Sequence, residues 1–235
     1  MLLVLPQLKN KVLVERPNNK LQIYDCVPIE MNDRREVQLS KLLSWLLRHR
    51  ANKEGLQISN DGYIAVSELL LHHSFRGKYN KSDIIRVVEN NSKKRFKLRQ
   101  NPQNNILEIK ANQGHSIDIN NTDLIQILEP KYETLVHGTY FKYWPKIKNA
   151  GLHHMSRKLI HLSKGILGNS NVISGLRRDV ELYVFIDLSA ALADGIRFYE
   201  SENGVVLTEG NVNGYLEPKY FSKVTVVKTG QQIYP

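Results

Sequence analysis

The segment "LLRHR" ends an apolar helical stretch with three residues that can each bind phosphate: Arg48, His49 and Arg50. An arginine guanidinium holds two phosphate oxygens at once and stays charged, and a histidine can also transfer a proton. A structural explanation is equally available, because the helix dipole stabilises cations in the last helical turn by about 0.3–1 kcal/mol each. The segment alone leaves both explanations open.

Common metal and nucleotide motifs are missing from the sequence. The single cysteine, Cys26, excludes an internal disulfide and a cysteine-rich zinc site. The pairs His72–His73 and His153–His154 have no supporting cysteine or carboxylate cluster, and neighbours on one element should point apart, so we expect no metal. Neither GxGxxG nor GxxxxGK[ST] occurs, so a nucleotide would have to bind to another kind of fold.

Positive charge is concentrated in one part of the chain. Residues 34–100 carry 15 basic and 6 acidic groups, whereas residues 1–33 carry 4 and 4, and residues 101–235 carry 14 and 13. This indicates a polyanionic partner, nucleic acid or anionic lipid, although a solvated charged face would give the same count. Because we find no signal peptide and no membrane-length apolar run, we expect an intracellular protein of the nucleus or cytoplasm.

Residues 33–124 have the pattern of helices followed by a basic hairpin. Asp33 and Glu36 have the spacing of a capping box and precede leucines at helical intervals as far as Leu47. A turn and a second short helix are expected in "NDGYIAVSELLLHH", and a third helix in "NKSDIIRVVENN". "KKRFKLRQ" and "NILEIKA" then alternate around a polar turn. This order predicts a winged-helix module. Residues 1–32 lack sustained periodicity and are predicted to be a loosely attached extension.

Residues 125–235 contain short, widely spaced strands, predicted in "ETLVHGT", "LIHLSKG", "ELYVFIDL", "GVVLTEG" and "KVTVV". A helix in "YFKYWPKIKNAG", closed by Gly151, lies between the first two, and another helix is predicted over "SAALADGIRFYE". Few helices among such strands predict a mixed-sheet α+β domain rather than an alternating parallel one. We therefore predict an α+β protein with lobes at 33–124 and 125–235.

Six motifs occur in a fixed order: "LLRH" at 46–49, "KKRF" at 93–96, "QGHS" at 113–116, "HGT" at 137–139, "MSR" at 155–157 and "HLS" at 161–163. Together they resemble the KptA-like RNA 2′-phosphotransferases, which act on tRNA, from about Val37 to about Val227. That family joins a winged-helix RNA lobe to an ADP-ribosyltransferase-like NAD lobe. The chain departs from it at "GNVNGY", where the family commonly has a proline after the last NAD-lobe strand.

The resemblance implies a reaction in two steps. The internal 2′-phosphate of spliced tRNA attacks the nicotinamide ribose of NAD, nicotinamide leaves, and an ADP-ribosylated RNA is formed. The ribose 2″-hydroxyl then attacks the phosphate and expels RNA with a free 2′-hydroxyl, leaving ADP-ribose 1″,2″-cyclic phosphate. The implied co-substrate is NAD without a metal, the partner is RNA with an internal 2′-phosphate, and we expect a monomer.

The resemblance also implies three sets of site residues. The catalytic set is Arg48, His49, Arg95 and Arg157. The NAD-binding set is His137, Gly138, Thr139, Ser156, His161, Leu162, Ser163, Gly175 and Arg177. The RNA-binding set is Lys93, Gln113, His115 and Ser116. Glu209 lies where many ADP-ribosyltransferases orient the ribose, but it is left out because this family does not depend on that glutamate.

Two other functions stay open from the sequence. The first is a winged-helix RNA-binding protein whose NAD lobe is inactive, which the presence of all four catalytic residues disfavours. The second is an ADP-ribosyltransferase that modifies nucleic-acid ends and stops after the first step. Without the order of the motifs, Arg95 would be read as a contact to backbone phosphate, Arg157 as a surface ion pair and His137 as structural.

Overall fold

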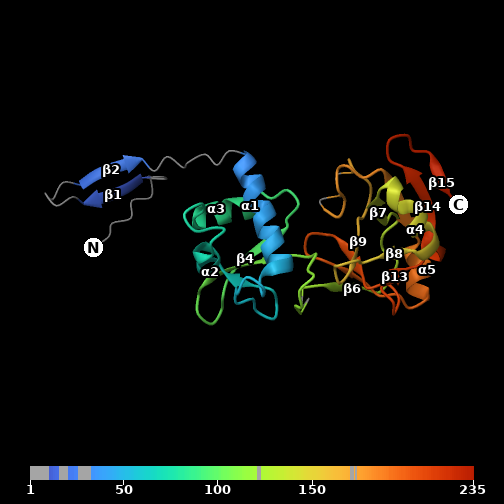
Figure 1. Ribbon diagram of the computed structural model, residues 1–235, viewed down its shortest axis with the longest axis horizontal. Helices are drawn as coiled ribbons and strands as arrows, with labels where there is room; N and C mark the ends of the chain where they lie inside the picture. The colour runs from blue at the N-terminus through green and yellow to red at the C-terminus, as the bar shows by residue number, and fades with distance from the viewer. Residues whose placement is uncertain (1–10, 16–20, 26–32, 121–122, 170–171, 173) are drawn as a thin grey trace. The chain divides into compact units, whose positions relative to one another are not determined.

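The computed structural model describes residues 11–15, 21–25, 33–120, 123–169, 172 and 174–235 (Figure 1). Its contacts divide the chain into two compact units, Met1–Gln38 and Leu39–Pro235. In the first unit, β1 (Lys11–Glu15) and β2 (Leu21–Asp25) form an antiparallel pair. These two strands were not predicted from the sequence, and the turn-prone segment "RPNN" between them lies outside the described residues.

The first helix begins at the predicted residue but ends irregularly. α1 (Asp33–Trp45) continues into a single π turn, η1 (Leu46–Arg50), in which the Ala51 N–H donates to the Leu46 carbonyl at 2.9 Å. The apolar stripe is buried as expected, with Leu39, Leu43, Leu46 and Leu47 0% exposed. The predicted helix is therefore confirmed, but its last turn is a π turn, which an apolar spacing of three and four residues does not reveal.

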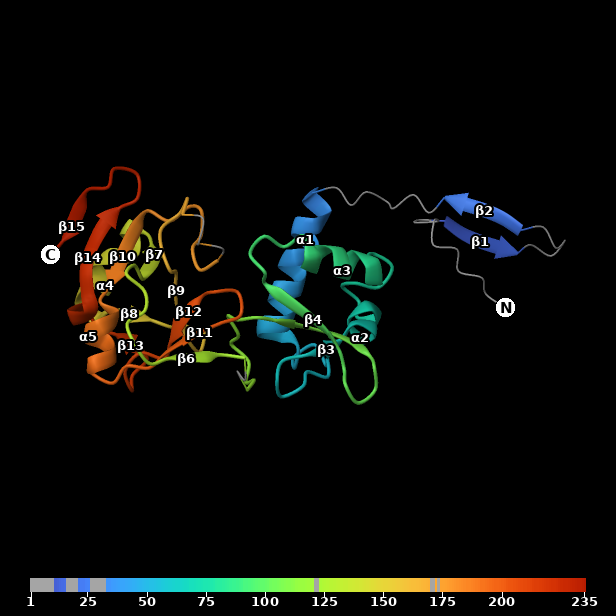
Figure 2. The ribbon, with the colours of Figure 1, turned by 180° about the vertical axis from the view of Figure 1, so that it is seen from behind.

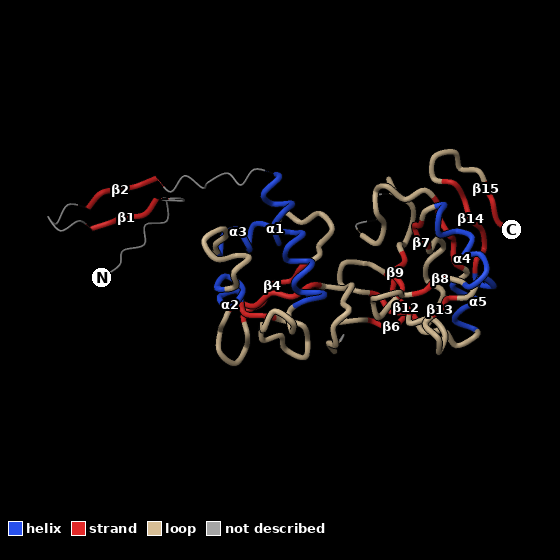
Figure 3. Tube along the Cα trace, in the orientation of Figure 1, coloured by secondary structure: helices blue, strands red, loops and turns tan. Residues whose placement is uncertain are grey.

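Two shorter helices follow, as predicted. α2 (Val66–Leu71) is one and a half turns long, and α3 (Lys81–Glu89) starts at a capping box formed by Asn80 and Asp83. α3 buries Ile84 and Val87 in the core. The three helices gather around one small sheet, as the helix and strand colours of Figure 3 show.

That sheet has the strand order β3-β5-β4, with β3 (Ile64–Ala65), β4 (Phe96–Gln100) and β5 (Leu107–Ala111). β4 and β5 are antiparallel, with Phe96 opposite Ala111, so the predicted hairpin is confirmed. The chain runs from β5 directly into residues 112–116, which carry the "QGHS" motif. The hairpin thus positions one edge of the candidate site.

The rest of the second unit is built mainly of strands (Figures 1 and 2). Its sheets have the orders β15-β14-β10-β7 and β6-β11-β12-β9, and a separate pair β13-β8. The strands are β6 (Ile125–Ile127), β7 (Val136–Thr139), β8 (Leu152–His153), β9 (Ile160–Leu162), β10 (Leu182–Ile186), β11 (Phe198–Glu200), β12 (Val206–Thr208), β13 (Tyr215–Leu216), β14 (Phe221–Val226) and β15 (Gln232–Tyr234). All five predicted strands are present and the α+β class is confirmed. Every described pair is antiparallel, which corrects the predicted mixed sheet.

Short helices link these strands: η2 (Phe141–Tyr143), α4 (Trp144–Ala150), α5 (Leu188–Ala193) and η3 (Pro218–Tyr220). α4 ends at Gly151, as predicted, with φ +94°. The helix predicted over "SAALADGIRFYE" is wrong in its second half. It ends near Gly195, whose φ of +82° stops a helix, and Phe198 then enters β11. Within the described residues, none of the helices is long and apolar enough to cross a membrane.

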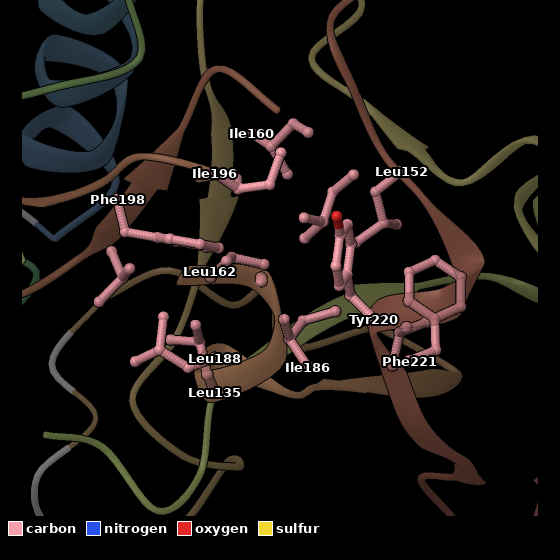
Figure 4. Close-up of a cluster of buried hydrophobic side chains, with 14 of the residues drawn as sticks. Leu135, Leu152, Ile160, Leu162, Ile186, Leu188, Ile196, Phe198, Tyr220 and Phe221 are labelled. Atoms are coloured by element: carbon pink, nitrogen blue, oxygen red, sulfur yellow. The ribbon is translucent and has the colours of Figure 1, made fainter. Parts of the chain in front are cut away.

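A hydrophobic core lies between the two four-stranded sheets. Figure 4 shows Phe198, Leu162, Leu135 and Leu188 on one side of this cluster and Tyr220 and Phe221 on the other. Phe198 and Leu162 are 0% exposed. Burying side chains of this size contributes about 1.5–3 kcal/mol each. This packing fixes β9 and, through it, the segment that carries His161 and Ser163.

Candidate active site

Arg48 is half-buried, and no acidic side chain of the described residues pairs with it. The π turn η1 directs its side chain against the main chain of Gly114, where an added Cβ would come within 3.5–3.6 Å of three Arg48 side-chain atoms. Its Nε and Nη2 are buried and have no hydrogen-bond partner. Burial, then the charges of Arg157 and Arg95, lower the pKa of Arg48 to about 10.

Arg95 is held just before β4 by its neighbours. Its main-chain N–H and its Nη1 both donate to Asn91 Oδ1, at 3.2 and 3.4 Å, and its carbonyl accepts from the Asn112 N–H at 2.9 Å. The preceding Lys94 has φ +43°, a left-handed conformation that side chains other than glycine rarely adopt. Burial lowers the pKa of Arg95.

Arg157 also follows a residue in the left-handed conformation and is held by a main-chain hydrogen bond. Met155, two residues before it, has φ +58°, and the Arg157 N–H donates to the His154 carbonyl at 3.1 Å. Burial, then the charge of Arg177, lower the pKa of Arg157. Lys94, Asn105 and Met155 are the non-glycine residues with positive φ in the described chain. Two of these three lie just before a predicted catalytic arginine.

The three arginines form a cationic cluster that lacks an anion. In the described part of the chain, no carboxylate forms an ion pair with Arg48, Arg95 or Arg157. A buried cation without an opposite charge destabilises a fold by several kcal/mol, and each of these guanidiniums lowers the stability of its neighbours' charged form. The cluster therefore fits a ligand with two negative charges, and phosphate matches the planar guanidinium fork.

His49 lies beside this cluster and is oriented by Ser116. Its Nδ1 is 2.9 Å from Ser116 Oγ, and the Ser116 N–H donates to the Arg48 carbonyl, also at 2.9 Å. Burial, then the charges of Arg48 and Arg157, lower the pKa of His49. The free protein therefore carries a neutral imidazole here at pH 7, with Nε2 left for a substrate.

The other predicted RNA-binding residues are engaged inside the protein. Lys93 Nζ donates to the Leu176 carbonyl at 2.9 Å, and Gln113 Oε1 lies 2.8 Å from His161 Nε2. His115 is 7% exposed, its Nε2 has no partner, and burial lowers its pKa to about 3. RNA contact by these side chains stays a prediction.

The predicted NAD-binding segments are brought together by one bridge between strands. Val136 and Ser163 exchange two main-chain hydrogen bonds, at 2.9 and 2.8 Å, which places "HGT" beside "HLS". His137 Nδ1 lies 2.9 Å from the His161 carbonyl and donates to it, and burial lowers the pKa of both histidines, that of His161 to about 3. Both imidazoles are therefore neutral.

Gly175 packs against the second of these segments. It has φ +102°, and an added Cβ would lie 3.2 Å from Ser163 Cα. Ser163 is 0% exposed and its Oγ has no hydrogen-bond partner among the described residues, so a buried polar group is left unsatisfied at this contact.

The remaining predicted cofactor residues differ in exposure. Thr139 and Leu162 are buried, and Leu162 packs in the core, so only its main chain could face a ligand. Ser156 and Arg177 are exposed, and a hydrogen bond with Tyr140 raises the pKa of Arg177. Glu209 forms an ion pair with Arg197 at 2.8 Å.

Residues 34–210 match the model of the family described as RNA 2′-phosphotransferase, Tpt1 / KptA family. The chain belongs to the Tpt1/KptA family. It is 46% identical over 197 residues to "tRNA 2′-phosphotransferase 1" of Danio rerio, covering 83% of this chain and 87% of that one. It is 46% identical to the human protein of the same name, over 80% and 75% of the two chains. It is also 40% identical to "tRNA 2′-phosphotransferase" of Saccharomyces cerevisiae, over 75% and 80%.

Sequence reasoning missed three residues that support the arginines of this Tpt1/KptA-family protein. Asn91 orients Arg95, Gly114 gives Arg48 its main-chain surface, and Asn112 holds the carbonyls of Lys94 and Arg95. Gly114 stands inside "QGHS" and could have been noticed there. Nothing in the sequence around the two asparagines points to this role, since the fold determines which groups they contact.

The two pairs of neighbouring histidines do not point apart as predicted. The rings of His72 and His73 are 4.1 Å apart, and their nitrogens and a Glu54 oxygen all lie within 4.8 Å of one another. His153 and His154 are stacked at 4.4 Å. At the first cluster Arg50 donates to Glu54 Oε1 at 3.1 and 3.3 Å, and its positive charge opposes a second cation there. The absence of a metal stays a prediction for this Tpt1/KptA-family protein.

Proposed function

We propose that this protein transfers the internal 2′-phosphate of spliced tRNA to NAD. The products would be 2′-hydroxyl RNA, nicotinamide and ADP-ribose 1″,2″-cyclic phosphate, formed through an ADP-ribosylated RNA. Membership of the Tpt1/KptA family and the names of the relatives support phosphate removal from tRNA. The observation that carries the proposal is the buried, unpaired guanidinium of Arg48 between two further arginines.

The arginines would bind the 2′-phosphate and stabilise the charge that develops on it. In the first step an anionic nucleophile needs mainly positioning, which fixed guanidinium forks provide. In the second step negative charge builds up on a crowded phosphodiester, and preorganised cations stabilise this transition state most. His49, held by Ser116, is within the same cluster and would give a proton to the RNA 2′-oxygen as it leaves.

The residues of "HGT", "HLS" and Gly175 fit a dinucleotide. The buried Ser163 hydroxyl lacks a hydrogen-bond partner among the described residues, and Gly175 lets the main chain of segment 174–177 pack closely on Ser163. NAD would supply the ribose carbon that accepts the phosphate and nicotinamide as a leaving group. The neutral imidazoles of His137 and His161 suit this role, because they add no further positive charge near a cationic nicotinamide.

The helices and hairpin of residues 33–112 would hold the RNA. Three helices followed by an antiparallel hairpin are the parts of a winged helix, and the excess positive charge of the chain lies in this stretch. Phosphate contacts from such a surface would position the RNA without reading its sequence.

The test is to incubate the full chain with an oligonucleotide bearing one internal 2′-phosphate, with and without NAD, and to weigh all products. We expect NAD-dependent loss of the phosphate and one nicotinamide for each phosphate removed. Equal release of inorganic phosphate with magnesium and no NAD would instead mean a phosphatase. RNA that keeps ADP-ribose would mean a transferase that stops after the first step, and binding without reaction would mean an inactive NAD lobe.

A further inference from the structure

Lys93 is held by protein groups at its side chain and at its main chain. Its Nζ donates to the Leu176 carbonyl at 2.9 Å, and its own carbonyl accepts from Asn203 Nδ2 at 3.1 Å. These partners are 83 and 110 residues away in sequence. Asn203 is 2% exposed, and its Oδ1 accepts from Ser201 Oγ at 2.8 Å, so its orientation is fixed. Lys93 is thus a fixed contact between the two predicted lobes.

Leu176 connects this contact to the candidate NAD site. Its side chain is 4% exposed and packs with Val136 and Val180, and a Cβ added to Gly138 would come within 2.8 Å of it. The preceding Gly175 packs against Ser163. The segment 174–177 is therefore pressed against both "HGT" and "HLS", and Lys93 binds its main chain.

Arg95 lies two residues beyond Lys93 on a short, constrained path. Lys94 between them is in the left-handed region, and its carbonyl accepts from Asn112 Nδ2 at 2.8 Å. Only Lys94 separates Lys93 from Arg95, so a shift of the Lys93 main chain would move the Arg95 main chain and strain its hydrogen bonds to Asn91 and Asn112. Burial, then the charges of Arg95 and Arg178, lower the pKa of Lys93, which agrees with an ammonium inside the cationic cluster.

We propose that Lys93 is a positioning residue that ties the cofactor segment 174–177 to Arg95. It would act through Arg95 and touch neither RNA nor NAD, in contrast to the RNA contact that the resemblance implies for it. The inference rests on the proposed function. Its consequence is that loss of the Lys93 ammonium should impair the use of NAD and the second step, but leave RNA affinity unchanged.

The test compares Lys93→Met, Lys93→Arg and Lys94→Met in the full chain. Lys93→Met keeps most of the side-chain volume and loses Nζ, so kcat/KM for NAD should fall roughly tenfold to a hundredfold, the value of a hydrogen bond from a charged donor. Lys93→Arg can still donate to the Leu176 carbonyl and should restore most of the activity. Lys94→Met removes the same charge from the exposed neighbouring side chain and measures the effect of net charge alone.

RNA binding at several salt concentrations separates the two roles of Lys93. A positioning residue leaves the slope of log K against log salt unchanged in Lys93→Met, whereas a lost phosphate contact lowers the slope by about 0.7. A lowered slope, or a loss of activity no larger than that of Lys94→Met, would overturn the inference. Failure of the proposed function is seen separately, in a wild-type protein that does not need NAD.

Discussion

Arg48 combines two properties that are rarely found in one side chain: two of its guanidinium nitrogens are buried, and no carboxylate among the residues that the structure describes pairs with it. Protein folds normally pair a buried charge, because leaving it uncompensated lowers stability. The arrangement is reasonable only if a ligand supplies the missing negative charge. Function and stability should therefore respond in opposite directions when this charge is removed.

The first prediction is that Arg48→Met abolishes turnover without destabilising the fold. Methionine fills much of the same space and removes repulsion from Arg95 and Arg157, so the free energy of unfolding should rise by about 1–3 kcal/mol. The rate should fall 10²–10³-fold or more, by about 3–4 kcal/mol, because a preorganised donor is lost. Urea unfolding and turnover on the same preparation would measure both. A destabilised Arg48→Met would mean that Arg48 has a structural partner.

The second prediction concerns the proton on His49. The charges of Arg48 and Arg157 contribute to its lowered pKa, so a bound dianionic phosphate should offset them and raise it again. As a general acid, His49 must be protonated, and kcat should fall as pH rises through this higher pKa in the bound enzyme. An NMR titration of the His49 ring with and without inorganic phosphate checks the direction.

Ser116→Ala is the matched variant for this prediction. It removes the 2.9 Å contact to Nδ1 but leaves the arginines in place. We expect a two- to tenfold loss in kcat, corresponding to about 0.5–1.5 kcal/mol for one hydrogen bond, with little change in RNA affinity. If phosphate does not change the pKa of His49, this histidine does not lie beside the bound anion.

At the scale of elements, regular structure was predictable and the turns that present the site were not. The five strands of residues 125–235 and the hairpin β4–β5 follow from alternation and β-branched composition, which are local properties. The π turn below Arg48 and the left-handed residues before Arg95 and Arg157 depend on contacts distant in sequence. The backbone preferences of these residue types disfavour such conformations, so they cannot be predicted from a single sequence.

The same distinction applies to the site residues. The order of motifs was enough to single out the arginines and His49, whose surroundings agree with an anion site. It could not show that Lys93 and Gln113 bond to other parts of the protein, because their partners Leu176 and His161 are far away in sequence.

The third prediction tests whether Gly114 is needed for Arg48 or only for its turn. Gly114 has φ +90° and faces the Arg48 side chain, whereas Gly77 has φ +72° and nothing within 4 Å of an added Cβ. Gly114→Val and Gly77→Val should both lose about 1–2 kcal/mol of stability from left-handed strain. Only Gly114→Val should also displace Arg48 and lower turnover at least tenfold. Equal activity losses in the two variants would assign the effect to stability alone.

At the scale of the whole molecule, the first 32 residues differ from the rest of the chain in charge and in family match. They fall in a separate compact unit, carry equal numbers of acidic and basic groups up to residue 33, and precede the stretch that matches the family. The fourth prediction is that a chain starting at Asp33 keeps its turnover within about twofold and its salt dependence of RNA binding, since the phosphate contacts are unchanged. A loss of turnover larger than twofold, or a change in the salt dependence of RNA binding, would mean that residues 1–32 contact the RNA.

The fifth prediction is that mild acid destabilises the whole second unit through two neutral histidines. Burial lowers the pKa of His115 and of His161 to about 3, whereas both should titrate near 6.5 in the unfolded chain. The unfolded state therefore binds more protons below pH 6.5, and stability falls as pH falls through that value towards 3. Between pH 7 and pH 5 each histidine should lower the free energy of unfolding by about 2 kcal/mol. Urea unfolding at the two pH values measures the total for all the buried histidines, His137 included, and His115→Gln should remove about 2 kcal/mol of it. A pH dependence that His115→Gln leaves unaltered would show that His115 takes up a proton in the folded protein.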